Sequence, residues 1–253
     1  MSLLSVKQLS VSLSQQKIIS GAELQIAKGE VVGLIGPNGA GKTTLMRAIL
    51  GLIPTVGHSS LARLSEDARA RAVAWMPQDR HIAWPIEVQS LIMLGRLPYR
   101  SYSRAPSAAD QQAVQAAMQQ VDLVGFAKRR ATELSVGERT RALIARALAQ
   151  QTPLLMADEP IAGLDPAHQM STMQTFVELA QRGNSVFLSI HDLGLAARYC
   201  SRLILLGEQK IIADGPPAEV LTPNNLARIF GIEAYFENTA HGRIFQPLRV
   251  LAP

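Results

Sequence analysis

One stretch near the start of the chain constrains the fold more than any other. It has the G-x-x-x-x-G-K-[ST] spacing of a phosphate-binding loop, and it lies between an apolar, β-branched run at 30–35 and a helical pattern at 44–50 that Gly51 ends. The stretch consists of Gly36, Pro37, Asn38, Gly39, Ala40, Gly41, Lys42, Thr43 and Thr44. A buried strand, a glycine loop and a helix in this order indicate an α/β protein.

The chemistry of this loop explains its residue types. Glycines leave room for backbone N–H groups to curl around phosphate oxygens, and the start of the following helix adds free donors and its dipole. Lys42 can then reach the β- and γ-phosphates, and the Thr43 hydroxyl can bind Mg²⁺. The loop therefore predicts a nucleoside triphosphate site, without indicating what the nucleotide drives.

Composition and charge limit the class of protein that this chain can be. The chain has 253 residues, of which 47% are hydrophobic and 18% charged, as expected of one large globular domain or two small ones. It lacks both a run of about 18 apolar residues and the features of a signal peptide, so we expect a cytoplasmic protein. Cys200, the single cysteine, excludes an intrachain disulfide, and the five histidines lack metal-ligand spacing. The net charge of +5 is dispersed, apart from a run at 128–130 that we expect to be solvated.

The pattern of apolar and polar residues divides the chain into regions of different expected structure. Residues 1–30 alternate loosely, which favours antiparallel strands with one wet face. Residues 80–150 show helical periodicity, which predicts a helical insertion in an α/β core formed by 1–79 and 151–253. The expected elements are a capped helix at 65–71, strands at 72–76, 154–157, 185–190, 202–206 and 210–213, helices at 88–94, 108–120 and 139–150, helices starting at Pro166 and Asp192, and a β-prone tail at 234–245.

An acid pair closes one of these strands. Asp158 and Glu159 follow an apolar run and precede Pro160. A carboxylate at a strand end can hold Mg²⁺ through a water molecule, and the next one can polarise the water that attacks a γ-phosphate. An ordinary strand-to-turn acid pair would look the same, but its position downstream of a phosphate-binding loop favours the catalytic interpretation.

A second helix start also has the properties of an anion site. Residues 134–138 read Leu-Ser-Val-Gly-Glu, in which Ser135 and Glu138 have capping-box spacing and Gly137 offers a backbone N–H. Because the chain already has a loop for its own phosphates, this second site suggests a γ-phosphate presented by another copy. We therefore expect a head-to-tail symmetric dimer.

These motifs, in this order, resemble those of the ATP-binding-cassette (ABC) ATPases over nearly the whole chain. The similar segments are 36–44 (Walker A), Gln78 (Q-loop glutamine), 134–138 (LSGGQ signature), 154–159 (Walker B), 163–165 (D-loop) and His191 (switch histidine). The resemblance implies a single ABC ATPase domain over residues 1–253. Its fold would be an α/β P-loop NTPase core with a mainly parallel sheet, an N-terminal antiparallel β subdomain and an inserted α-helical subdomain at about 80–150.

The resemblance also implies roles for individual residues. Those implied to be catalytic are Glu159, His191, Gln78 and Asp158. Those implied to bind the nucleotide are the nine residues of the loop together with Ser135, Gly137, Glu138 and Asp165. Those implied to bind metal are Thr43, Gln78 and Asp158, and the implied cofactors are ATP and Mg²⁺. Taken singly, Asp165 is also a good helix cap and His191 an ordinary packed histidine; their shared order favours the functional interpretation.

A narrower likeness concerns importers of ferric siderophores, haem and vitamin B12. It rests on Glu138 at the end of the signature and on segments 93–98, 157–160, 164–169, 191–193 and 215–223. It implies an ATP-hydrolysing motor on the cytoplasmic face of the inner membrane, working with a second copy, with permease subunits docked near Gln78 to Leu94 and, indirectly, with a periplasmic binding protein. We expect the apolar run at 82–86 to be exposed for this docking, and we expect no nucleic-acid partner.

Three departures from the family's pattern carry further expectations. Leu13 lies where the family usually has an adenine-stacking aromatic, Val136 replaces the first signature glycine, and the segment 55–65 is short, which suggests a trimmed hairpin. A weakly hydrolysing regulatory module, favoured slightly by Leu13 and Val136, stays open as an alternative function. So does a nucleic-acid- or translation-linked ABC ATPase, although such proteins usually have two cassettes or long insertions, and this sequence shows neither.

Overall fold

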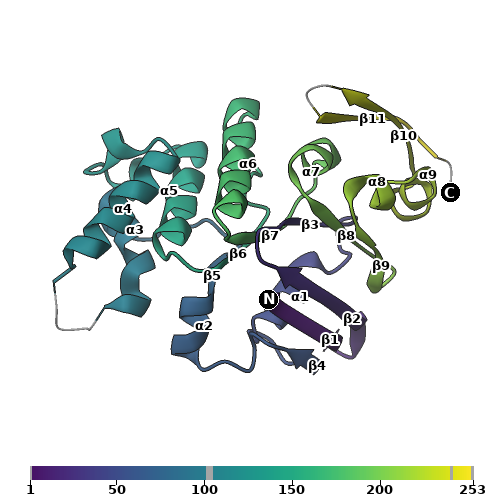
Figure 1. Ribbon diagram of the computed structural model, residues 1–253, viewed down its shortest axis with the longest axis horizontal. Coiled ribbons are helices and arrows are strands. Elements are labelled where there is room, and N and C mark those ends of the chain that lie inside the picture. The colour runs from purple at the N-terminus through teal and green to yellow at the C-terminus, as the bar shows by residue number, and fades with distance from the viewer. Residues whose placement is uncertain (1, 101–104, 240–241, 252–253) are drawn as a thin grey trace.

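The central sheet of the computed structural model has the strand order β5-β6-β7-β3-β8-β9 (Figure 1). The structure describes residues 2–100, 105–239 and 242–251. The strands of this sheet are β3 (Val31–Ile35), β5 (Val73–Met76), β6 (Leu154–Asp158), β7 (Ser185–Ser189), β8 (Arg202–Gly207) and β9 (Lys210–Gly215). Only the pair β8–β9 is antiparallel, so the mainly parallel sheet is confirmed. Every residue of β3, β6 and β7 is buried, because both faces of the sheet are covered.

The strand order determines which loops meet. β3 lies between β7 and β8, and β6 lies on the far side of β7. Since β3, β6 and β7 are parallel, the chain leaves all three at the same edge of the sheet. The glycine loop after β3, the acid pair at the end of β6 and His191 after β7 are therefore gathered at this edge.

A second sheet is antiparallel, with the order β2-β1-β4. β1 (Ser2–Leu13) and β2 (Gln16–Ala27) form a hairpin, and β4 (Val56–Ser59) pairs with the other edge of β1. The inward-facing residues of β1 and β2 form one core with α1 (Lys42–Ile49) and one face of the central sheet. The expected antiparallel N-terminal region is thus present, and the short segment 55–65 contributes a single strand to it instead of a hairpin.

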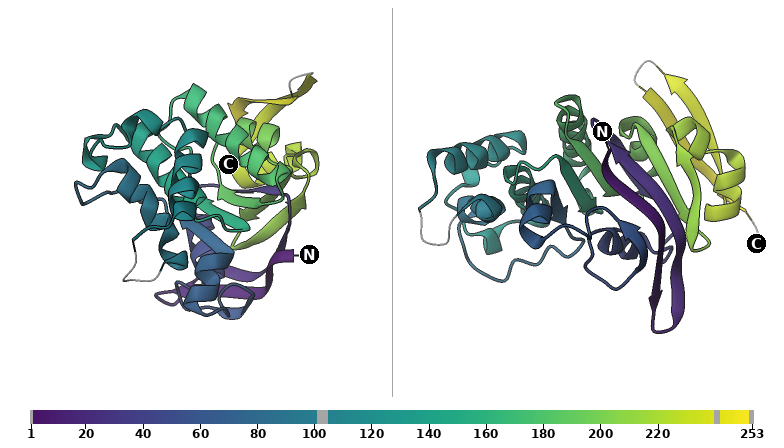
Figure 2. Two further views of the ribbon diagram at one scale, coloured as in Figure 1. Left: turned by 60° about the vertical axis from the view of Figure 1, so that its left-hand side comes forward. Right: turned by 60° about the horizontal axis from the view of Figure 1, so that its bottom comes forward.

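The helices between β5 and β6 lie to one side of the central sheet (Figures 1 and 2). They are α3 (Val88–Met93), α4 (Ala108–Gln120) and α5 (Val136–Ala149), with 3₁₀ turns η1 (Leu94–Tyr99), η2 (Val124–Phe126) and η3 (Ala131–Glu133); α2 (Glu66–Ala72) precedes β5. Two helices begin earlier than expected, α1 at Lys42 and α5 at Val136 instead of Arg139. In both cases the residue just before the helix, Gly41 or Ser135, is the N-cap, so the first helical turn lies inside the sequence motif.

A buried ion pair fastens this helical region. Nε of Arg96 in η1 lies 2.9 Å from Oδ1 of Asp110 in α4, and both side chains are buried. The guanidinium of Arg96 also donates to the carbonyl oxygen of Ala149, the last residue of α5, at 2.8 Å. One side chain therefore links three helical segments.

The C-terminal third completes the layers. α6 (Pro166–Gln181) and α7 (Leu193–Tyr199) pack on the face of the sheet opposite α1. The chain continues through α8 (Pro217–Val220), α9 (Pro223–Asn225), the π-helix η4 (Leu226–Phe230) and an antiparallel hairpin of β10 (Ile232–Thr239) and β11 (Gly242–Val250). The β-prone tail expected at 234–245 lies in this hairpin, except for 240–241, which are outside the described residues. In the described part of the chain, no helix is both long and apolar enough to cross a membrane.

Candidate active site

The glycine loop has the backbone geometry of an anion cradle. Gly39 and Gly41 have φ values of 80° and 96°, in the left-handed region that favours glycine. A Cβ on Gly36 would lie 2.2 Å from the carbonyl oxygen of Leu206 in β8, so only glycine fits there. Gly41 caps α1 without a side-chain hydrogen bond, which leaves the first N–H groups of the helix available to a ligand.

The Lys42 side chain folds back onto the start of its own loop. Its side chain is buried, and Nζ donates to the carbonyl oxygens of Gly36 at 2.8 Å and Pro37 at 3.1 Å. Burial lowers the pKa of Lys42, while the nearby carboxylates of Glu159 and Asp158 raise it. The ammonium group is thus held inside the loop, where a phosphate could exchange for the two carbonyl oxygens.

Asp158 ends β6 with a carboxylate that is only 1% exposed. Its Oδ1 accepts a hydrogen bond from Ser189 Oγ at 2.6 Å. Its Oδ2 is buried and has no hydrogen-bond partner among the described residues. A buried carboxylate oxygen without a partner is costly, so this atom suits a metal-bound water.

Glu159 adopts an unusual backbone conformation for its residue type. Its φ of 51° lies in the left-handed region, and its N–H donates to Ser189 Oγ at 2.8 Å. Its side chain is mostly buried, and Oε1 lies 2.5 Å from His191 Nε2. The ends of β6 and β7 are paired neighbours in the sheet, and the strained backbone of Glu159 turns its carboxylate toward His191 after β7.

The segment 134–138 forms the start of α5 as a complete capping box. Ser135 Oγ accepts from the Glu138 N–H at 3.3 Å, and the Ser135 N–H donates to Glu138 Oε2 at 2.7 Å. Val136 is the first helical residue, with a negative φ and a side chain that is 59% exposed. A Cβ on Gly137 would meet only Leu164, at 3.7 Å, so the backbone of Gly137 is open to an approaching group.

The remaining predicted site residues occupy loops beside this edge. Gln78 follows β5 and is exposed. Asp165 caps α6: Oδ1 accepts from the His168 N–H at 3.0 Å, and Oδ2 lies 2.5 Å from His168 Nδ1. These bonds to His168 lower the pKa of Asp165. Lys42, Asp158, Glu159 and His191 are therefore brought together at one sheet edge, whereas the start of α5 belongs to the helical region to the side (Figure 1).

Comparison with known proteins decides the family. Residues 19–162 match the family described as ABC transporter. The chain belongs to the ABC transporter family. It is 39% identical to the hemin import ATP-binding protein HmuV of Bordetella avium over 91% of this chain and 93% of that protein. It is 40% identical to the cobalamin import ATP-binding protein BtuD of Halobacterium salinarum, where the match covers 90% of this chain but only 58% of the relative.

The fold comparison agrees with this assignment. A solved ABC transporter, described as being of the metal-chelate type and in an inward-facing conformation, contains a chain with a TM-score of 0.86 and 25% identity to this one. The match covers 98% of both chains. The expected fold, an ABC ATPase cassette with a mainly parallel sheet, an antiparallel β region and helices, is confirmed.

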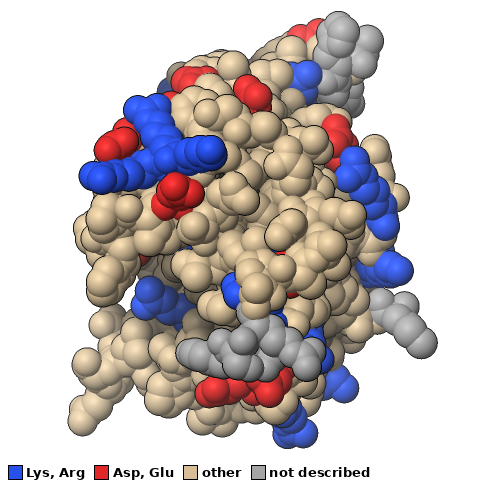
Figure 3. All heavy atoms as spheres, turned by 90° about the vertical axis from the view of Figure 1, so that its left-hand side faces the viewer, with Lys and Arg blue, Asp and Glu red and all other residues tan. Residues whose placement is uncertain are grey.

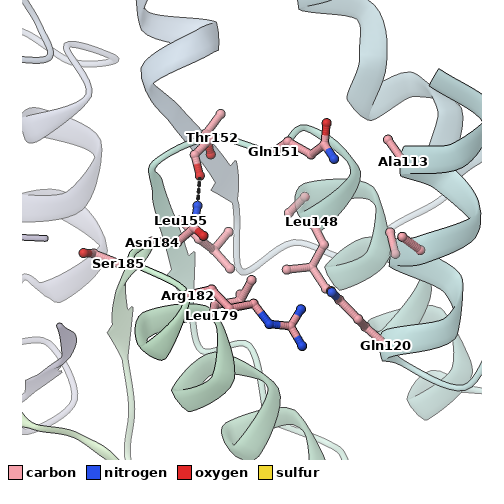
Figure 4. Close-up of a pocket in the computed structure, with 13 residues that line it drawn as sticks. Ala113, Gln120, Leu148, Gln151, Thr152, Leu155, Leu179, Arg182, Asn184 and Ser185 are labelled. Atoms are coloured by element: carbon pink, nitrogen blue, oxygen red, sulfur yellow. Dashed lines mark hydrogen bonds between the residues drawn. The ribbon is translucent and has the colours of Figure 1, made fainter. Parts of the chain in front are cut away.

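A cavity of about 260 Å³ elsewhere in the ABC cassette contains none of the predicted site residues. It lies at the seam between the helical region and the core, where α4 and the last turn of α5 face β6 and the end of α6 (Figure 4). Small side chains such as Ala113 and Ala147 line it, and Asn184 Nδ2 donates to the Thr152 carbonyl oxygen at 2.9 Å. The seam is thus incompletely filled on this side.

Two site residues escaped sequence analysis. Ser189 is the last residue of β7 and binds both members of the acid pair. Arg80, two residues after Gln78, donates to the backbone carbonyl of Glu159. The position of Ser189 at the end of an apolar strand could have indicated its role. Nothing in the local pattern around Arg80 indicates its acceptors.

Proposed function

We propose that this chain is the ATP-hydrolysing motor subunit of a membrane importer for iron complexes, siderophore or haem, or for vitamin B12. The observation that carries the proposal is the convergence of Lys42, Asp158, Glu159 and His191 at one edge of the sheet. The near-full-length similarity to a hemin import ATP-binding protein and the similarity to a cobalamin import protein support the substrate class.

The proposal assigns a role to each residue at the sheet edge. The loop 36–44 and the start of α1 bind the phosphates, and Lys42 moves from its carbonyl acceptors to the β- and γ-phosphate oxygens. Glu159 accepts a proton from the attacking water, with His191 orienting its carboxylate at 2.5 Å and contacting the γ-phosphate. The Ser189 hydroxyl holds Asp158 and the Glu159 backbone in register.

Mg²⁺ fits the donors that the chain provides. Asp158 offers a buried oxygen without a partner among the described residues, Thr43 a half-buried hydroxyl and Gln78 an exposed amide oxygen, all of the oxygen type that Mg²⁺ prefers. No group of three or more His, Cys, Asp or Glu side chains suited to a metal occurs in the described ranges, so such an ion would take much of its coordination from phosphates and water. When bound, Mg²⁺ would neutralise charge on the phosphates.

The active form in this proposal is a head-to-tail dimer with two sandwiched nucleotides. The start of α5 carries the open Gly137 and the hydroxyl of Ser135, yet it belongs to the helical region and not to the sheet edge (Figure 1). A second copy would bring its γ-phosphate to Ser135, Gly137 and Glu138. Asp165, at the start of α6, would border the same interface.

The permease would dock on the loop from Gln78 to Leu94. Trp84 is 73% exposed there, which favours a partner surface. The expectation that the whole run 82–86 is exposed was wrong, because Ile82 and Ile86 are half-buried and pack against the core. These two isoleucines anchor the loop, so Trp84 is presented from a fixed base. A periplasmic binding protein would take part only through the permease, and the subunit would lie on the cytoplasmic face of the inner membrane.

The two alternative functions receive less support from the structure. On the face seen in Figure 3, acidic and basic side chains are interspersed around a largely uncharged centre, without the continuous basic stripe of a nucleic-acid surface. The regulatory-module interpretation drew on Val136, but its negative φ lets the valine open α5 without backbone strain.

Transport in cells separates these functions. A deletion strain of the source organism should lose growth on haem, on a ferric siderophore or in vitamin B12-dependent medium, and the wild-type gene should restore it. Trp84→Glu should leave ATP hydrolysis by the purified subunit intact but abolish that restoration, since a charge replaces the exposed ring. Val124→Glu, on an exposed valine in η2, is the control and should restore growth. Full restoration by Trp84→Glu would place the permease elsewhere.

A further inference from the structure

Arg80 joins three segments that are far apart in the sequence. It lies in the loop that leads from β5 to α3 and is half-buried. One terminal nitrogen donates to Thr140 Oγ1 in α5 at 3.0 Å and to the carbonyl oxygen of Ala162. The other donates to the carbonyl oxygen of Glu159. A planar guanidinium is the side chain best suited to hold several acceptors in fixed directions.

The Arg80 contact completes the support of the Glu159 backbone. A non-glycine residue in the left-handed region is strained and persists only where its surroundings fix it. Ser189 holds the N–H of Glu159, and Arg80 holds its carbonyl oxygen. The Ala162 N–H also donates to that oxygen, at 3.1 Å, so Arg80 is the one side chain among these three backbone restraints that comes from the loop after β5.

The same guanidinium reaches the start of α5 through Thr140. The Thr140 side chain is fully buried, and its hydroxyl accepts from Arg80 while donating to the carbonyl oxygen of Val136 at 2.9 Å. Val136 lies between Ser135 and Gly137. A continuous series of hydrogen bonds therefore runs from the backbone of Glu159 to the first turn of α5.

The other end of α5 is held differently. Its last turn, at Ala147 and Leu148, borders the cavity of about 260 Å³ at the seam with the core (Figure 4). Beside the cavity, Nε2 of Gln150, the C-cap of α5, donates to the carbonyl oxygens of Ala70 and Val73 at 2.6 Å and 3.2 Å, which ties this end to the segment before β5 and to β5 itself. The first turns are tied to the core separately, through the Arg80–Thr140 bond. A displacement of the start of α5 would thus be passed to Glu159 through Arg80.

We propose that Arg80 is a positioning residue that ties the Glu159 backbone to the start of α5, and thereby couples the two ATP sites of the dimer. The inference rests on the proposed ATPase function. A nucleotide of the second copy that contacts Ser135 and Gly137 acts, through Thr140 and Arg80, on the carboxylate that serves the chain's own nucleotide. Hydrolysis should therefore depend cooperatively on ATP concentration.

Steady-state kinetics of three variants test the coupling. Arg80→Met, which keeps the length of the side chain but removes its donors, should lower kcat by about tenfold or more and bring the Hill coefficient toward one. ATP affinity, measured without Mg²⁺ so that hydrolysis cannot occur, should change by less than about twofold. Arg80→Lys, which can reach only some of the acceptors, should recover part of kcat, and Arg182→Met, at the exposed arginine that follows the last residue of α6, is the matched control.

Three results would overturn the coupling role. The first is that kcat and cooperativity are unchanged in Arg80→Met. The second is that ATP affinity falls by as large a factor as kcat. The third is that the kcat of the variant equals that of the wild type at a lower temperature at which both proteins are fully folded. Thr140→Val should reduce cooperativity, Thr140→Ser should retain it, and Arg80→Met should add little to Thr140→Val in that respect. Independent additive losses would contradict a shared path.

The tie is the series of hydrogen bonds from Glu159 through Arg80 and Thr140 to Val136. Hydrogen exchange can test it even if the wild-type chain hydrolyses no ATP. The Ala162 N–H donates to the Glu159 carbonyl oxygen that Arg80 also binds. In the nucleotide-free chain, Arg80→Met should speed exchange in 159–162 and 136–140, and Arg182→Met should not. Unchanged exchange in both segments would refute the tie, whereas failure of ATP hydrolysis by the wild type would refute the proposed function alone.

Discussion

The N-termini of α1 and α5 are both proposed to face phosphate, yet they are built in opposite ways. α1 starts after Gly41, with no side-chain cap, no acidic residue in its first turn and Lys42 as its first residue. α5 starts after Ser135 with a full capping box and the acidic Glu138 in its first turn. The Ser135 N–H lowers the pKa of Glu138 below its ordinary value of 4.5, so this carboxylate is charged at neutral pH.

This difference indicates that the start of α1 can bind a phosphate by itself, whereas the start of α5 can only add contacts to a phosphate that is already bound. At α1, free N–H donors, the helix dipole and an ammonium group all attract an anion. At α5, the capping box already satisfies part of the donors, and the Glu138 carboxylate offsets the dipole. We infer that α1 binds the nucleotide by itself, and that α5 adds contacts only to a nucleotide already held by the other copy.

The largest effect on turnover is expected at Glu159, which follows β6. Glu159→Gln should lower turnover by about a thousandfold, because the amide cannot accept a proton from water, while ATP binding at α1 persists. ATP should then accumulate in a stable dimer closed on α5, which size-exclusion chromatography with and without ATP would detect. Turnover close to that of the wild type would exclude Glu159 as the base.

A large and opposite pair of effects is expected at neighbouring positions of α5. Gly137→Val should lower turnover by about a hundredfold, since a branched side chain would fill the space where the second copy's phosphate approaches. Val136→Gly should change it by less than about tenfold, because the exposed Val136 already has helical backbone angles. Neither change should alter ATP binding at α1. A hundredfold gain from Val136→Gly would instead identify the valine as a brake and favour the regulatory function.

A moderate effect on stability is expected at a third helix start, that of α4. Asp110 forms the same capping box with Ser107, but it is buried and paired with Arg96. The hydrogen bonds from Ser107 and Arg96 lower the pKa of Asp110 from 3.8 to about 2. A depressed carboxyl pKa stabilises the fold above pH 3.8, and this contribution is lost as the pH falls toward about 2.

Urea unfolding of Asp110→Asn measures this contribution. At pH 7 the variant should lose about 3 kcal/mol of unfolding free energy, because Arg96 stays buried without its partner charge. The difference from wild type should shrink as the pH approaches 2. Glu138→Gln, at the more exposed box of α5, should cost less than about 1 kcal/mol. Equal costs at both positions would contradict the role of burial.

The smallest effect is expected at the base of the nucleotide. Leu13 is 44% exposed at the end of β1 and cannot stack on adenine as an aromatic ring does. Losing such a stack removes about 1–3 kcal/mol, so ATP and GTP should bind with affinities within about tenfold of each other. Leu13→Tyr should strengthen ATP binding. A strong natural preference for ATP would show that another residue supplies the stack.

Local patterns in the sequence were sufficient for most features that depend on residues a few positions apart, although α1 and α5 begin two and three residues earlier than those patterns predicted. The capping boxes at Ser107 and Ser135, the proline start of α6 and the glycine loop all involve contacts within about four residues, and each was predicted with the element that it begins. Apolar runs located the buried strands for the same reason. The family's motif order then placed Glu159 and His191 in one site, and the structure brings them to within 2.5 Å.

Only the tertiary structure decided what those residues touch. Ser189 meets Asp158 and Glu159 because β6 and β7 are adjacent and parallel, a pairing that no local pattern encodes. Arg80 finds its acceptors 60 to 82 residues further along the chain, on α5 and after β6. Half-burial of Ile82 and Ile86 likewise depends on the core beneath them. The sequence by itself determined the helix caps, the strands and the phosphate loop, since their interactions are local. Folding decided the partners of Ser189 and Arg80, because strand order and packing create contacts between distant segments.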